Sequence, residues 1–159
     1  MSRPVAYGQA YGGKLMVDIA CAASQPFQAN GGKWVHLATA SMLATLSSGA
    51  NTANLVGWAD VGTLSSSSTA GNDIVPVNLA LDAAYEMPIN ATQTETQLRQ
   101  LVGKLCDIEI ASAIQYADYD ASSDNSLQII GYKYYGSEAG EQSLICRLNH
   151  GAITSYTGV

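Results

Sequence analysis

Residues 127–135 read Leu-Gln-Ile-Ile-Gly-Tyr-Lys-Tyr-Tyr, and residues 143–148 read Ser-Leu-Ile-Cys-Arg-Leu. The segment between these apolar runs, 136–141, begins with Gly136 and is polar enough to be a turn. Two short apolar runs joined by such a turn predict a β-hairpin. In the first strand Tyr132 and Tyr134 are two residues apart, so they should share one face of the sheet. Tyrosines in this arrangement either cover their own sheet or contact a partner, and both interpretations stay open.

Similar apolar runs precede the hairpin. They occupy residues 15–20, 33–38, 54–61, 73–79, 85–89 and 106–110. Short apolar runs at near-regular spacing, separated by polar turns, are typical of a small all-β domain. Gly57, which lies beside Trp58 inside one run, indicates a bulge or a close approach of another backbone.

One segment has helical rather than strand periodicity. Apolar residues recur at helical spacing between residues 98 and 105, and Thr94 with Gln97 has the spacing of a capping box. We therefore predict one short α-helix at about residues 94–105. The expected fold is mainly β, a small antiparallel barrel or sandwich with this helix and an extended N-terminal arm.

The arm is predicted from residues 1–14, which contain three glycines and neither a helical nor a strand period. We expect residues 15–159 to form a single domain. Arg3, Tyr7 and Tyr11 belong to the arm, and tyrosines are rigid amphipathic anchors that suit contact with a neighbouring subunit. The alternative is an ordinary frayed terminus.

Composition excludes several classes of function. Only 13% of the residues are charged, 47% are hydrophobic, and the net charge is -6 without any basic run. We therefore expect no direct nucleic-acid partner. The sequence has neither a signal peptide nor a long apolar segment, so we expect no membrane association and synthesis in the cytosol. Cys21, Cys106 and Cys146 are too widely spaced for a disulfide framework and are interpreted as buried thiols.

A search for catalytic or metal-binding patterns finds little. His36 lies on a predicted strand, where we expect a hydrogen-bonded or surface histidine, and His150 follows the last strand. Asp118-x-Asp120-x-x-x-Asp124 lacks the glycine and glutamate of a calcium loop, so a turn capped by its own side chains is the simpler interpretation. We expect no cofactor and no resident metal ion.

The carboxylates of Asp107 and Glu109 lie on one strand face, where a solvated face is the expected interpretation. A phosphate-binding glycine loop is also missing.

The order of these features from Gly31 onward resembles the small β-barrel cement, or decoration, proteins of tailed-bacteriophage heads. The resemblance covers most of residues 15–150 and lies in the tryptophan-containing strands 34–37 and 55–58, the Ser/Thr-Gly loop, the helix ending near 100–107 and the closing strands. It is a likeness of layout, and no catalytic residue carries over.

The resemblance implies a structural virion protein, not an enzyme, that binds the outer surface of an icosahedral capsid and stabilises it. The implied partner is the major capsid protein, the implied state is a homotrimer, and the implied location is the exterior of a virion assembled in the host cytoplasm. The residues expected to contact the capsid or a neighbouring subunit are Arg3, Tyr7, Tyr11, Tyr132 and Tyr134.

One alternative is a minor tail or fibre module that binds a receptor or glycan. The least favoured alternative is a hydrolytic enzyme in which His36 and His150 converge with acidic residues.

Overall fold

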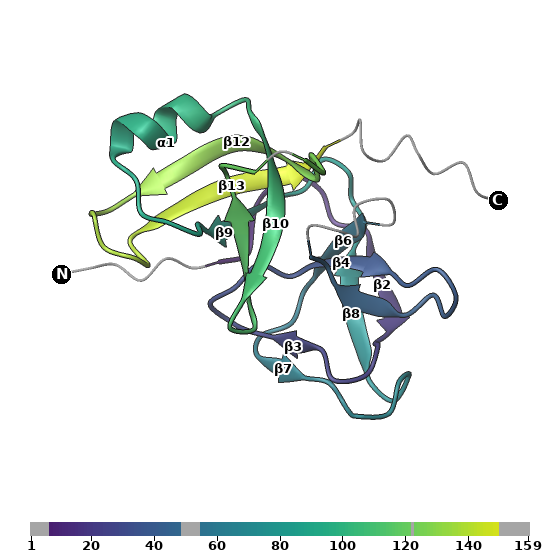
Figure 1. The fold of residues 1–159 in the computed structure, drawn as a ribbon. Helices are drawn as coiled ribbons and strands as arrows, with labels where there is room; N and C mark the ends of the chain where they lie inside the picture. The colour runs from purple at the N-terminus through teal and green to yellow at the C-terminus, as the bar shows by residue number, and fades with distance from the viewer. Residues whose placement is uncertain (1–6, 49–54, 122, 150–159) are drawn as a thin grey trace.

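The computed structural model describes residues 7–48, 55–121 and 123–149, which form a mainly β protein with one short helix (Figure 1). The strands are β1 (Gln9–Tyr11), β2 (Met16–Ala20), β3 (Pro26–Phe27), β4 (Trp34–Leu37), β5 (Ala44–Leu46), β6 (Leu55–Ala59), β7 (Leu64–Ser65), β8 (Ile74–Asn78), β9 (Ala84–Pro88), β10 (Leu105–Ala111), β11 (Ile114–Asp118), β12 (Leu127–Tyr134) and β13 (Gln142–Leu148). The helix α1 spans Glu95–Leu101 and follows β9.

These strands form two main antiparallel sheets in a sandwich-like arrangement. One sheet has the order β1-β9-β13-β12-β10-β11, the other has the order β2-β8-β6-β4-β5, and β3 pairs with β7 in a small third sheet. The six-stranded sheet curls until β11 approaches β9, where Ile89 and Ala117 form a single parallel bridge. A single bridge does not close the sheet with a continuous ladder of hydrogen bonds. Of the two predicted architectures, the structure therefore has the sandwich and not the closed barrel.

The hairpin predicted from residues 127–148 is confirmed. β12 and β13 pair in register from Leu127 with Leu148 to Tyr134 with Gln142, with a bulge between Ile129 and Gly131.

The predicted helix is also confirmed, but it is shorter than 94–105. Thr94 caps it through the predicted box, in which the Gln97 N–H donates to Thr94 Oγ1 (3.3 Å) and the Thr94 N–H donates to Gln97 Oε1 (2.9 Å). The helix ends early because Val102 is extended and Gly103 adopts a left-handed φ of 92°. The chain then turns at once into β10.

Aromatic side chains join the two sheets. The indoles of Trp34 and Trp58, from the five-stranded sheet, pack with Tyr85 of the six-stranded sheet. The rings of Trp58 and Tyr85 stack with centroids 4.4 Å apart, and Trp34 meets both rings edge-on. Beside Trp58, Gly57 lets β6 lie close to β8 within the five-stranded sheet, because a Cβ there would lie 2.1 Å from the carbonyl oxygen of Asn78. The predicted close backbone approach at Gly57 is therefore confirmed.

Part of the predicted arm belongs to the sheet. Gln9–Tyr11 forms the edge strand β1, which pairs with β9, and the Glu86 N–H donates to the carbonyl of Gly8 (2.8 Å). The expectation that residues 1–14 build no element is therefore wrong for β1. Sequence periodicity misses it because three residues are too few to show a period, and the pairing partner lies more than seventy positions away. Residues 1–6 lie outside the described residues.

Candidate functional site

The largest exposed apolar side chains of the N-terminal segment lie on two edge strands and in the segment between them. Tyr11 on β1 is 62% exposed, Leu15 is 58% exposed, and Met16 and Val17 on β2 are 40% and 41% exposed. We call these four residues the apolar edge. The carbonyl of Leu15 accepts from the Leu79 N–H (2.9 Å), and the Gly13 N–H donates to the Asp82 carboxylate (3.2 Å), so the segment between the strands is held in place.

The first residues of β2 are uncovered on both faces of the strand, whereas Ile19 packs against the second core cluster. Met16 and Val17 are adjacent, so their side chains point to opposite faces of the strand, yet both are exposed to a similar degree. Within the described parts of the chain, β2 pairs only with β8. An edge strand with apolar side chains and unpaired backbone groups favours association with another polypeptide.

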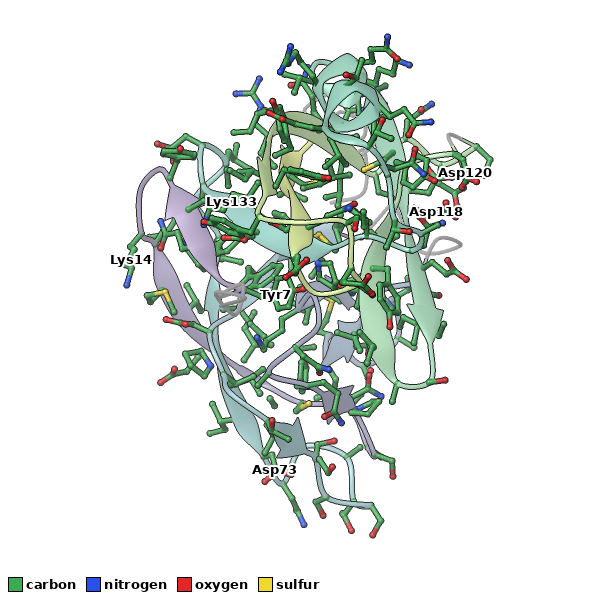
Figure 2. The ribbon with its side chains drawn as sticks, turned by 90° about the vertical axis from the view of Figure 1, so that its left-hand side faces the viewer. Tyr7, Lys14, Asp73, Asp118, Asp120 and Lys133 are labelled. Carbon is green, nitrogen blue, oxygen red and sulfur yellow. The ribbon has the colours of Figure 1, made fainter. Side chains whose placement is uncertain are left out.

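The structure separates the predicted contact residues into different environments. Tyr11 joins the apolar edge, whereas Tyr7, labelled in Figure 2, lines a pocket that Tyr11 does not line. Tyr132 and Tyr134 pack against the main core cluster. Arg3 lies outside the described residues.

Tyr132 is held by the helix. Its hydroxyl accepts from Arg99 Nε (3.4 Å) and donates to Glu95 Oε1 (3.3 Å). This geometry favours the interpretation that the tyrosines of β12 cover their own sheet.

A pocket of about 810 Å³ lies between the C-terminal end of strand β9 and the β10–β11 hairpin. Its walls are partly apolar, with Pro88, Ile89 and Ile114, and partly polar. Tyr7, Tyr116, Glu109, Asn30 and Asn90 supply hydroxyl, carboxylate and amide groups. The pKa of Tyr7 is raised by burial first, and then by the negative charge of Glu86 and by Tyr116.

Beside the pocket, the carboxylates of Asp118 and Asp120 lie close enough to interact. Asn90 Nδ2 donates to Asp118 Oδ1 (2.9 Å) and more weakly to Asp120 Oδ1 (3.4 Å). The pKa of Asp118 is raised to about 6, first by burial and then by the hydrogen bond with Asp120 and the negative charges of Asp120 and Glu109. Below about pH 6 the pair therefore holds one proton, which is the usual result when two carboxylates share a site. Figure 2 shows both residues on the side of the molecule away from Lys14.

The acidic loop after β11 is closed by a residue of β10. The Asp107 carboxylate accepts from the backbone N–H groups of Ser123 (2.9 Å), Asp124 (3.1 Å) and Asn125 (2.7 Å). Asp107 is only 3% exposed, so the expectation of a solvated face is wrong for this residue. The sequence could not show this, because the three donors come from a loop sixteen or more positions away. Across the described residues, no three His, Cys, Asp or Glu side chains gather as metal ligands.

His36 differs from its expectation of a hydrogen-bonded or surface residue. It is 8% exposed, and its Nδ1 finds no hydrogen-bond partner in the part of the chain that the structure describes. Burial lowers the pKa of His36, so the neutral imidazole is favoured. His150 lies outside the described residues.

The three cysteines are free thiols and buried, as interpreted from their spacing. A hydrogen bond with Cys106, and then burial, raise the pKa of Cys146, so this thiol stays protonated. Among the described helices, none has the length and apolar character needed to cross a membrane.

No protein family, curated protein or solved structure matches this chain. The sequence singled out Tyr7 and Tyr11 as expected contact residues and Glu109 as a strand carboxylate, but it did not indicate the other residues of either surface. The signal for the apolar edge was the run of large apolar residues at 15–17, but a run of this kind does not reveal whether the strand is covered. The pocket is built from separate segments and has no local signal.

Proposed function

We propose that this protein is a structural virion protein that binds the outside of an icosahedral capsid through the apolar edge. The single observation that supports the proposal is the exposure of Tyr11, Leu15, Met16 and Val17, which lie on two consecutive edge strands and, for Leu15, in the segment between them. Apolar residues gathered at an exposed sheet edge are uncommon on a protein that works alone, because they favour association and aggregation. The likeness of layout to capsid decoration proteins supplies the kind of partner.

The chemistry of the edge suits contact with a protein surface. β2 offers backbone N–H and C=O groups on its open side, which can extend a sheet of the partner. Lys14, which Figure 2 shows at the margin of the molecule, and Asp18 bring a positive and a negative charge to the same segment. Charged residues at an edge set the register and limit pairing with wrong partners.

If three copies bind together as a trimer, a weak contact by each copy would be enough to attach the protein to the capsid. A capsid presents identical sites at fixed spacing, so the second and third contacts of a homotrimer form at high effective concentration. On this proposal the major capsid protein is the partner, and the protein contributes attachment and stiffness, without catalysis.

The test compares two matched valines. Val17 on the apolar edge is 41% exposed, and Val102 beyond the helix is 43% exposed. Capsids prepared without this protein are incubated with wild type, Val17→Glu or Val102→Glu, and bound copies are counted by quantitative mass spectrometry. We expect wild type and Val102→Glu to bind at about one copy per major capsid protein, and Val17→Glu to lose at least tenfold in affinity.

Circular dichroism should show that both variants stay folded. Binding of only a few wild-type copies per particle would favour the tail or fibre alternative instead. Equal binding by the two variants would remove the apolar edge from the proposal, and no binding by wild type would overturn the proposal as a whole.

A further inference from the structure

The pocket beside Tyr7 contains polar groups that the protein's own structure does not use. Within the described parts of the chain, no hydrogen bond occupies the Glu109 carboxylate or the hydroxyls of Tyr7 and Tyr116. Polar groups that converge on a cavity without internal partners are typical of a ligand site. At about 810 Å³ the cavity also falls in the range of roughly 300–1,000 Å³ that small-molecule sites occupy.

The charge of the pocket limits the ligand. Among the residues that the structure describes, no lysine, arginine or histidine lines the pocket, while Glu109 does, and the Asp118–Asp120 pair lies next to it through Asn90. A phosphate, a carboxylate or a nucleic-acid backbone would meet only negative charge here. The ligand must therefore be neutral or positively charged.

The walls limit the ligand further. A purely apolar ligand would cover Glu109 and Asn30 without offering hydrogen bonds, and a buried carboxylate without a partner is costly. A purely polar ligand would gain nothing from Pro88, Ile89 and Ile114. The combination requires a compact molecule with hydroxyl donors at its rim and C–H groups on its faces.

Saccharides have this combination. We infer that the pocket binds a neutral or amino saccharide, with the rings of Tyr7 and Tyr116 against its C–H faces and the Glu109 carboxylate accepting from its hydroxyl or ammonium groups. Tyrosine suits this position because its ring is apolar and its hydroxyl can still bond to the ligand. Exposed Thr92 and Ala139 at the rim leave the pocket open to solvent, so the end of a longer glycan can enter.

This inference does not depend on the proposed capsid contact. The pocket residues and the apolar edge share no member, so a variant in one should leave the other unchanged.

The test measures binding of the full chain to an array of neutral, amino and acidic glycans, followed by titration calorimetry on the best ligand. N-acetylglucosamine trimer, maltotriose and glucosamine are the neutral and amino probes, and sialyllactose is the acidic probe. We expect saturable binding to at least one neutral or amino probe and none to sialyllactose. Tyr116→Ala should weaken that binding at least tenfold, and Glu109→Gln should weaken it at least threefold.

The matched control is Tyr135→Ala, which removes a tyrosine that is 46% exposed and does not line the pocket. It should bind within twofold of wild type, as should Val17→Glu. Thermal unfolding checks that each variant is folded. Binding to acidic glycans alone, no saturable binding to any neutral or amino glycan, or equal binding by Tyr116→Ala, Glu109→Gln and wild type would each overturn the inference.

Discussion

Replacing Gln115 by leucine should destabilise the protein more than any surface substitution, because this side chain ties the two sheets together. Gln115 lies on β11 and is fully buried. Its Oε1 accepts from the Trp34 N–H (2.8 Å), and its Nε2 donates to the carbonyls of Trp34 (3.0 Å) and Ser47 (2.8 Å). One amide therefore satisfies three backbone groups of the other sheet.

The size of the destabilisation follows from the backbone groups that leucine would leave without a hydrogen-bond partner. The Trp34 carbonyl keeps a second donor, the Ser47 N–H (2.8 Å), but the Trp34 N–H and the Ser47 carbonyl lose the partner that Gln115 provided. Each buried backbone group without a partner costs about 1–3 kcal/mol, so the loss in the free energy of unfolding should be about 2–6 kcal/mol. This is a large share of the roughly 5–15 kcal/mol that stabilises a typical domain.

Urea unfolding followed by tryptophan fluorescence measures this loss, because Trp34 and Trp58 are both buried in the core. The midpoint should fall by about 1–3 M with an unchanged slope, given a slope of about 2 kcal/mol per M. Gln100→Leu, which changes an exposed glutamine of the helix, is the control and should cost less than about 0.5 kcal/mol. A loss below about 1 kcal/mol for Gln115→Leu would show that the two sheets do not depend on this amide.

Three further substitutions test the electrostatics and capping. Asp118→Asn should flatten the pH dependence of the free energy of unfolding. The folded-state pKa of Asp118 is raised from 3.8 to about 6. The protonated carboxyl therefore stabilises the folded protein fully at low pH, and this stabilisation is lost as the pH rises through 6. Urea midpoints of wild type should fall relative to the variant over that window, and parallel profiles would contradict the shared proton with Asp120. Lys133→Met should cost about 2–4 kcal/mol at pH 7, because it leaves the Glu86 carboxylate, which is 2% exposed, without its ion pair. The double variant with Glu86→Gln should recover most of this loss, and no recovery would refute the ion pair as the cause. Thr94→Ala should cost about 1 kcal/mol through the lost helix cap, as measured by thermal unfolding, and an unchanged melting temperature would show that the helix is held by packing alone.

The two proposals use separate surfaces of the molecule. The apolar edge lies on β1 and β2, whereas the pocket lies between β9 and the β10–β11 hairpin. A protein that attaches through one surface and binds a saccharide through the other would place that saccharide site on the outside of the particle. The capsid-binding test and the glycan-binding test can each be interpreted even if the other gives a negative result.

The sequence by itself determined the features that depend on near neighbours. The hairpin at 127–148, the capping box at Thr94 and the glycine at position 57 follow from side-chain period, turn chemistry and backbone sterics within a few residues. The mainly β class follows from the same local patterns, because each short apolar run is long enough for a strand and too short for a buried helix.

Only the tertiary structure decided what depends on strands far apart in the chain. β1 exists because the edge of β9 offers it backbone partners, and Asp107 is buried because a distant loop donates to it. The order of the strands made β2 an edge, which exposed Met16 and Val17, and brought Tyr7, Glu109 and Tyr116 to one pocket. Local patterns fix which segments become strands, but which strand lies at an edge and which side chains meet depends on long-range pairing that leaves no local mark in the sequence.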